Sequence, residues 1–259
     1  MKNKRRSPFA AALVIVAGLI ISGGSYAAAN AVVKHSNTSQ AVTQSQLEEG
    51  KQLFLANCAS CHGKNGVGTS AAPTLIGVGA ASADFQVSSG RMPAQADGPQ
   101  MQVKPVQFTR EQIDAIAAYV GSLGTGPAIP SADMTAANGD AVRGGELFRI
   151  NCAMCHNAVG AGGALTEGKY APALKNIPNT RIYEAMLTGP QNMPVFNDAN
   201  ITPTDKKDII TYLKYLDENP SAGGYELAGL GPVAEGLFIW IIGLGLIIGF
   251  TVWLGAKSN

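Results

Sequence analysis

Histidine and cysteine are both scarce in this chain of 259 residues, which has three of the first and four of the second. Charge is scarce as well, because Asp, Glu, Lys and Arg make up 14% of the residues and leave a formal net charge of +1. The lack of strong positive charge excludes a nucleic-acid-binding protein, which needs a basic surface to hold phosphates. With 46% hydrophobic residues, the chain is also too apolar to be a disordered protein.

All four cysteines lie in two copies of one short string. Residues 57–62 read Asn-Cys-Ala-Ser-Cys-His, and residues 151–156 read Asn-Cys-Ala-Met-Cys-His. The C-x-x-C-H pattern is typical of covalent haem c attachment, in which two thiols add to vinyl groups and the histidine ligates the iron. The sequence therefore predicts two covalently bound haem c groups. Their attachment residues would be Cys58, Cys61 and His62 in the first copy, and Cys152, Cys155 and His156 in the second.

The two motifs belong to a longer internal duplication. When Cys58 is aligned with Cys152, Gly50 falls on Gly144, and in each copy an Ala-Pro-x-Leu string, a Met-Pro pair and a closing helix follow. The duplicated unit is therefore a whole domain. We expect the domains at 45–123 and 140–217, with linkers at 124–139 and 218–235.

Each closing helix carries a start signal and one apolar stripe. Thr109 precedes the helix predicted over 110–123, and Thr202 with Pro203 opens the one predicted over 203–216. Apolar residues recur in both at helical spacing. The sequence thus predicts an all-α fold of two domains of about 80 residues each, a size at which a bound haem would supply much of the apolar centre.

Methionine is the expected second axial ligand of each iron. His35 is the only histidine outside the two motifs, so bis-histidine ligation would depend on it. Met92 and Met193 each precede a proline and lie between the haem motif and the closing helix of their repeat. A thioether ligand raises the reduction potential, and the proline disfavours helix at the methionine. The expected iron ligands are His62 and Met92 in the first repeat, and His156 and Met193 in the second.

Other methionines are weaker candidates. Met101 is the one competitor in the first repeat, and it has no counterpart in the second. Met134 lies in the linker, and Met186 lies on a helix predicted over 180–188, where a packing role is expected.

The Ala-Pro-x-Leu strings suggest how the histidines are held. An axial histidine usually donates its other ring N–H to a carbonyl, which fixes the orientation of the ring. The carbonyl oxygens of Pro73 and Pro172 are the expected acceptors, and a simple turn role for these prolines is the alternative.

Hydrophobic segments stand near both ends of the chain. Residues 1–33 combine a basic start with an uncharged stretch, which predicts an export segment, either a cleaved signal peptide or a retained signal anchor. Residues 236–256 are expected to form a C-terminal transmembrane helix, with a helix buried in a soluble core as the alternative. Lys257 and the basic start favour the cytoplasmic side, so both haem domains are expected on the extracytoplasmic side of the cell membrane.

Together the motifs resemble two class I cytochrome c domains in tandem, and this resemblance implies that the first and last helices of each domain cross near the aligned glycines. A narrower resemblance rests on the order of export segment, haem domains and C-terminal anchor. It also rests on the strings at 85–93, 187–194 and 240–243. By these features the chain is similar to the dihaem cytochrome c subunit (cytochrome cc) of the actinobacterial cytochrome bcc complex, the menaquinol:cytochrome c reductase.

This resemblance implies an electron-transfer subunit of a quinol:cytochrome c reductase, a translocase, without a catalytic site of its own. The subunit would accept single electrons from a Rieske iron–sulfur partner and deliver them through both haems to an aa3-type terminal oxidase. A cytochrome b subunit and membrane lipid are the other implied partners.

Two other functions stay open from the sequence. A dihaem peroxidase would need an iron with an open position, which the matching Met-Pro pairs disfavour. A cytochrome c subunit of another membrane oxidase or dehydrogenase would carry the same motifs. A tandem cbb3-oxidase subunit, however, would normally be anchored from its N-terminal side.

Overall fold

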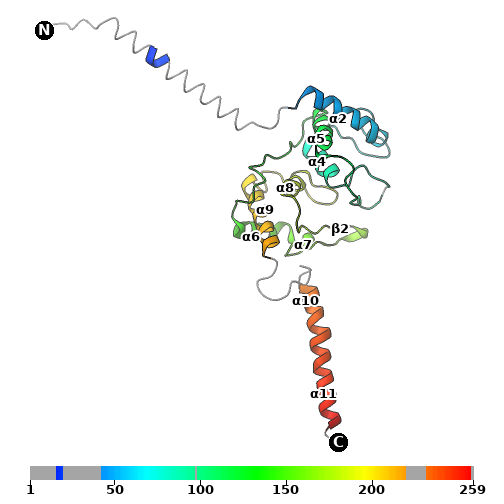
Figure 1. Cartoon of the computed structure of the whole chain (residues 1–259), viewed down its shortest axis with the longest axis vertical. Coiled ribbons are helices and arrows are strands. Elements are labelled where there is room, and N and C mark those ends of the chain that lie inside the picture. Colours follow the sequence, from blue (N-terminus) through cyan, green and yellow to red (C-terminus); the bar gives the residue numbers. More distant parts are fainter. Residues whose placement is uncertain (1–15, 20–41, 97, 220–231, 258–259) are drawn as a thin grey trace, which may run out of the picture. The chain divides into compact units, whose positions relative to one another are not determined.

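The computed structural model describes residues 16–19, 42–96, 98–219 and 232–257 (Figure 1). The chain divides into two units, Met1–Thr43 and Gln44–Asn259. Both repeats and the C-terminal helix belong to the second unit. The export segment expected at 1–33 lies outside the described residues except for 16–19, which are helical, and His35 also lies outside them.

The first repeat is helical, and its core is formed where its first and last helices pack together. Its helices are α2 (Gln44–Asn57), α3 (Ala59–His62), α4 (Ala80–Ser88) and α5 (Arg110–Ser122). Figure 1 shows α2 beside α5. Phe54 of α2 is fully buried against apolar residues of α5, with its ring centroid 5.2 Å from that of Tyr119. An aromatic pair in this tilted arrangement stabilises the crossing beyond the area it buries.

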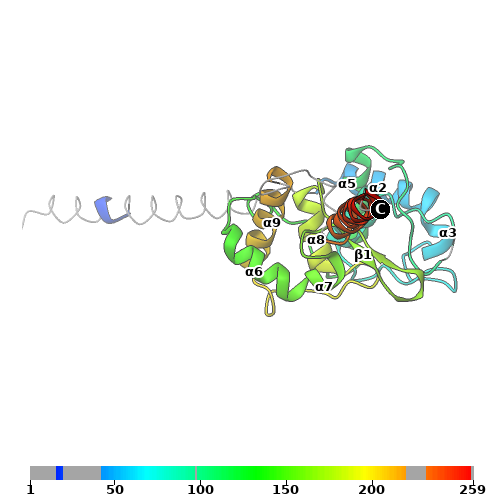
Figure 2. The same ribbon diagram turned by 90° about the horizontal axis from the view of Figure 1, so that it is seen from below.

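The second repeat has the same helical plan. Its helices are α6 (Ala141–Asn151), α7 (Ala153–His156), α8 (Asn179–Thr188) and α9 (Pro203–Glu218). Figure 2 shows α6 beside α9, where Phe148 and Tyr212 lie with ring centroids 5.6 Å apart. Met186 is buried in this core, in agreement with its predicted packing role, and Met134 packs against the same core.

A short antiparallel sheet in the second repeat departs from the purely helical prediction. Strand β1 (Gly163–Ala164) pairs with β2 (Tyr170–Ala171) across a turn of 3₁₀ helix. The reason is loop length. Pro172 follows its motif histidine by 16 residues, whereas Pro73 follows its own by 11, and the additional residues form the hairpin.

The predicted starts of the closing helices are confirmed. The Thr109 hydroxyl accepts the Gln112 N–H while the Gln112 side chain accepts the Thr109 N–H, and Thr202 forms the same reciprocal pair with Asp205. These bonds satisfy N–H groups that a helix start leaves without partners. Helix α9 continues two residues beyond the predicted end, and α5 ends one residue before it.

Glycine allows the two helices of each pair to approach closely. A Cβ atom added to Gly50 would lie 1.9 Å from the Ala115 carbonyl oxygen, and one added to Gly144 would lie 2.0 Å from that of Asp208. These distances are far inside van der Waals contact. The crossing of first and last helices near the aligned glycines is therefore confirmed in both repeats.

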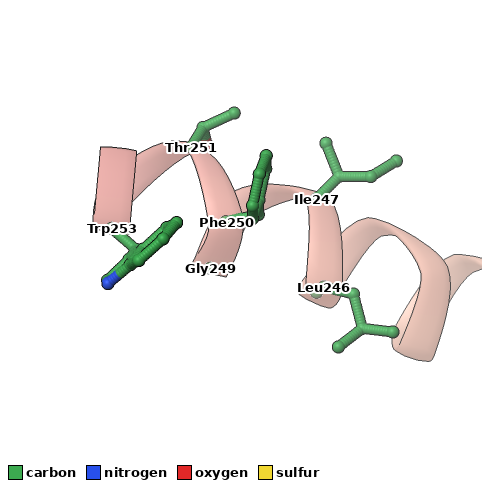
Figure 3. Close-up of a pocket in the computed structure, with 7 residues that line it drawn as sticks. Leu246, Ile247, Gly249, Phe250, Thr251 and Trp253 are labelled. Atoms are coloured by element: carbon green, nitrogen blue, oxygen red, sulfur yellow. The ribbon is translucent and has the colours of Figure 1, made fainter. Parts of the chain in front are cut away.

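The C-terminal segment forms one continuous helix, made of α10 (Pro232–Phe238), a π-helical segment (Ile239–Leu244) and α11 (Gly245–Lys257). Residues Ala234–Lys257 form a span of 24 residues that is long and apolar enough to cross a membrane. None of this span is buried inside the protein, whereas a helix in a soluble core would be mostly buried. Figure 3 shows Leu246, Phe250 and Trp253 projecting from α11. The π-helical segment was not predicted.

Replacing Gly50 with alanine should destabilise the first repeat by about 1–3 kcal/mol, because the added methyl group forces α2 away from α5. Gly98→Ala is the control, since a Cβ there meets its nearest neighbour at an ordinary 3.7 Å. Denaturant unfolding followed by helical circular dichroism measures both variants. Equal stability of the two would contradict the close crossing.

Candidate haem sites

Each C-x-x-C-H motif continues directly from the first helix of its repeat. The Cys58 N–H donates to the Phe54 carbonyl at 2.8 Å, and the Cys152 N–H makes the same bond to Phe148. The motif residues then form the short helices α3 and α7. Helical spacing places cysteines three residues apart on neighbouring positions of one face. None of the four cysteines forms a disulfide, so each motif has two sulfur atoms for thioether attachment.

The structure brings each motif histidine onto the predicted carbonyl. His62 and His156 are both 8% exposed. Their Nδ1 atoms lie 2.8 Å from the Pro73 carbonyl oxygen and 2.9 Å from that of Pro172. A carbonyl only accepts, so Nδ1 carries the proton and the lone pair of Nε2 stays available to a metal. Burial lowers the pKa of His156 more than its bond to Pro172 raises it, which keeps this ring neutral.

Two glycines that the sequence reasoning missed allow the proline loops to reach the histidines. Gly68 and Gly162 each follow their motif histidine by six residues, and each N–H donates to that histidine's carbonyl oxygen. Both have φ near +80°, and a Cβ on either would collide with the proline loop. Their equal spacing in the two repeats was the signal that could have identified them.

The two candidate methionines share a location relative to their motifs. Met92 is half-buried and packs against the hydrophobic cluster that Cys58 also contacts. Met193 and Cys152 have the same relation to the cluster of the second repeat. Met101, the competitor, has its backbone N–H bonded to Gln191 of the other repeat. Met92 and Met193 thus each share an apolar cluster with the first cysteine of their own motif.

The donor chemistry of these residues fits a haem better than a bare metal ion. Burial, with a smaller contribution from the adjacent motif cysteine, raises the pKa of Cys58 to about 11 and that of Cys152 to about 12. These buried thiols therefore hold their protons at neutral pH. Within the described ranges, no three His, Cys, Asp or Glu side chains converge to hold a metal ion.

A buried polar seam joins the repeats where α4 packs against α8. Asp84 of α4 is 2% exposed and forms an ion pair with Arg110, and Glu184 of α8 is fully buried. Arg181 donates to the Ser88 carbonyl across the same seam. Burial, and then the charge of Asp84, raise the pKa of Glu184 to about 9. Glu184 therefore keeps its proton at pH 7.

Comparison with known families agrees with this geometry. Residues 47–124 match the cytochrome c family, and residues 139–213 match the family described as cytochrome c oxidase, cbb3-type, subunit III. Each match includes one C-x-x-C-H motif, its proline loop and its Met-Pro pair. The chain is thus a protein of two tandem cytochrome c domains, whose motifs imply haem c binding, followed by an apolar helix.

Relatives that match along the whole chain define the family more closely. The cytochrome bc1 complex cytochrome c subunit of Corynebacterium efficiens is 44% identical, over 100% of this chain and 93% of the relative. The corresponding subunit of Mycobacterium leprae is 46% identical, over 95% and 87%. A cbb3-type cytochrome c oxidase subunit of Azospirillum is 34% identical over only 49% of this chain and 45% of the relative. The chain belongs to the family of cytochrome c subunits of the cytochrome bc1 complex.

Replacing Glu184 with glutamine should flatten the pH dependence of stability. The unfolded chain releases the Glu184 proton near pH 4.5 and the folded chain only near pH 9, so this group's contribution to folding falls as pH rises between these values. Glutamine has nearly the same shape as glutamate but does not titrate. We expect the melting temperature of the wild type to fall by a few degrees more than that of the variant from pH 5 to pH 9.

The control for this measurement is Glu48→Gln, which changes an exposed glutamate on α2. Its melting curve should follow the wild type at every pH. Parallel curves for Glu184→Gln and the wild type would show that Glu184 does not retain its proton in the fold.

Proposed function

We propose that this chain is the dihaem electron-transfer subunit of a respiratory quinol:cytochrome c reductase. It would relay single electrons from a Rieske iron–sulfur partner to an aa3-type terminal oxidase through two covalently bound haem c groups. The observation that carries the proposal is the repeated site, in which a buried motif histidine donates Nδ1–H to a proline carbonyl. Full-length similarity to cytochrome bc1 complex cytochrome c subunits supports the same function.

The residues that would hold the two haems follow from the duplicated geometry. Cys58, Cys61, Cys152 and Cys155 would form the thioether bonds, with His62 and Met92 as axial ligands in the first domain and His156 and Met193 in the second. Each haem would supply a one-electron iron couple. The proline carbonyls hold the imidazoles in one orientation, and Met92 and Met193 would supply the second ligands. With both axial positions taken, an electron relay is favoured over peroxidase chemistry.

Membership of the family implies other subunits of a membrane complex. We propose a cytochrome b subunit and the Rieske protein as stable partners, the oxidase as the acceptor, and membrane lipid around residues 236–256. Lys257, which follows the apolar span, would lie on the cytoplasmic side. The haem domains at 45–123 and 140–217 would then lie on the extracytoplasmic side of the cell membrane.

Replacing Met92 or Met193 with alanine should remove the near-infrared sulfur-to-iron band of one haem and leave both haems covalently attached. The thioether is lost, whereas the cysteines and histidines are unchanged. Absorbance of the denatured pyridine haemochrome measures attachment. Met101→Ala is the matched control and should keep both bands. Loss of a band in that variant instead of Met92→Ala would assign the first ligand to Met101.

Co-purification tests the assignment to a respiratory complex. Affinity capture of the full chain from detergent-solubilised membranes should recover a cytochrome b and a Rieske protein, and quinol should reduce both haems of the captured complex. Met193→Ala should slow the delivery of electrons to the oxidase at least tenfold, because ligand loss changes the potential of the second site. Capture with a quinoprotein dehydrogenase alone, or peroxide turnover by the isolated chain, would contradict the proposal.

A further inference from the structure

The loop after Met92 is longer than its counterpart in the second repeat. Residues 94–108 separate the Met-Pro pair from the cap threonine in the first repeat, whereas only residues 195–201 do so in the second. The additional length includes Gln100 and Met101. Both of these residues form hydrogen bonds with the second repeat.

Gln100 is bound to one residue of the other repeat through both ends of its side-chain amide. Its Nε2 donates to the Tyr170 carbonyl oxygen at 2.9 Å, and its Oε1 accepts the Tyr170 N–H at 2.8 Å. The side chain is only 7% exposed. Turning it away would leave buried polar groups without partners, which is costly. Gln100 therefore fixes the position of β2 at Tyr170.

Tyr170 leads directly into the loop that orients the second motif histidine. It begins β2, and Pro172 follows after the single buried residue Ala171. The Pro172 carbonyl is the partner of His156 Nδ1 at 2.9 Å. Any displacement of Tyr170 is passed through two peptide units to this carbonyl, whose position governs the orientation and basicity of the imidazole.

The residue next to Gln100 contacts the other ligand loop of the same site. The Met101 N–H donates to Oε1 of Gln191 at 3.1 Å. Gln191 lies two residues before Met193, within a turn closed by the bond from the Met193 N–H to the Pro190 carbonyl at 3.0 Å. Neighbouring residues of one loop thus hold both the histidine side and the methionine side of the second site.

The same loop is anchored at its own end to the first candidate methionine. The Lys104 N–H donates to the Gly90 carbonyl at 3.2 Å, and Lys104 Nζ donates to the Pro93 carbonyl. A Cβ on Gly90 would lie 1.9 Å from the Lys104 carbonyl oxygen, so the two segments are in close contact. Gly90 and Pro93 lie on either side of Met92. An unbroken series of contacts therefore runs from the loop of Met92 to the loop of Met193.

We propose that Gln100, on the loop that follows Met92 in the first domain, is a positioning residue for the second haem site. The inference rests on the haem ligation proposed above. It goes beyond that ligation because it makes the geometry of the second site depend on a residue of the first domain.

Gln100→Met in the full-length chain, purified with its membrane complex, tests this positioning role. Methionine has nearly the shape of glutamine and removes both hydrogen bonds to Tyr170. We expect the reduction potential and the low-spin ferric EPR signal of the second haem to shift, and electron transfer between the haems to slow severalfold. The first haem should be unchanged. Loss of the signal in Met193→Ala identifies which signal belongs to the second site.

Two further variants separate positioning from general destabilisation. Gln100→Leu likewise removes both hydrogen bonds without adding a charge and should shift the second site as Gln100→Met does. Gln102→Met changes an exposed neighbour and should match the wild type. A lower melting temperature with both potentials and both signals unchanged would reduce Gln100 to a structural tie and overturn the inference. Equal shifts at both haems would overturn it too.

The haem content of the wild type keeps this inference separate from the proposed function. Fewer than two covalent haems per chain would refute the ligation itself, and the inference with it. Two haems per chain, combined with an unmoved second site in Gln100→Met, would refute only the positioning role.

Discussion

The hydrogen bond from a buried motif histidine to a proline carbonyl is the constraint on which both sites depend. A single hydrogen bond of this kind contributes only about 1 kcal/mol net, but a buried ring nitrogen without a partner would cost more. The bond selects one tautomer and so directs Nε2 toward the site. It also requires the proline loop to approach closely, which Gly68 and Gly162 permit through positive φ angles and the absence of a side chain. Loop, glycine and histidine therefore form one unit in each repeat.

Both repeats have the same arrangement of histidine, proline loop and glycine. The contacts between the repeats, in contrast, come from segments in which the two copies differ. Among the described residues, the hairpin of β1 and β2 lies in the second repeat alone, whereas the sequence gives the long loop at 94–108 to the first repeat. These two insertions meet at Gln100 and Tyr170. The duplicated part thus defines each site, and the divergent parts define how one site is held against the other.

What could be predicted from the sequence is what depends on local spacing. The C-x-x-C-H motifs, the Thr109 and Thr202 caps and the apolar stripes are set by residues within one or two helical turns of each other. The fold class and the bounds of the closing helices, to within two residues, could therefore be derived. Pro73 and Pro172 could be expected as acceptors because the same Ala-Pro-x-Leu string follows the haem motif in both repeats. The hairpin, the π-helical segment and the seam between Asp84 and Glu184 depend on contacts between residues distant in the chain. No local pattern marks a lone glutamate on an amphipathic helix as fully buried.

The polar contacts between the repeats have a consequence for electron transfer. Two apolar helix faces can slide past one another with little change in energy, because dispersion and burial have no direction. Hydrogen bonds from Gln100 to both backbone groups of Tyr170, and from Arg181 to the Ser88 carbonyl, are satisfied in one register only. The neutral acid Glu184 packs against Asp84 in that register without adding a second buried charge. Electron transfer between two sites depends steeply on their separation, so a seam that permits a single register keeps that separation constant.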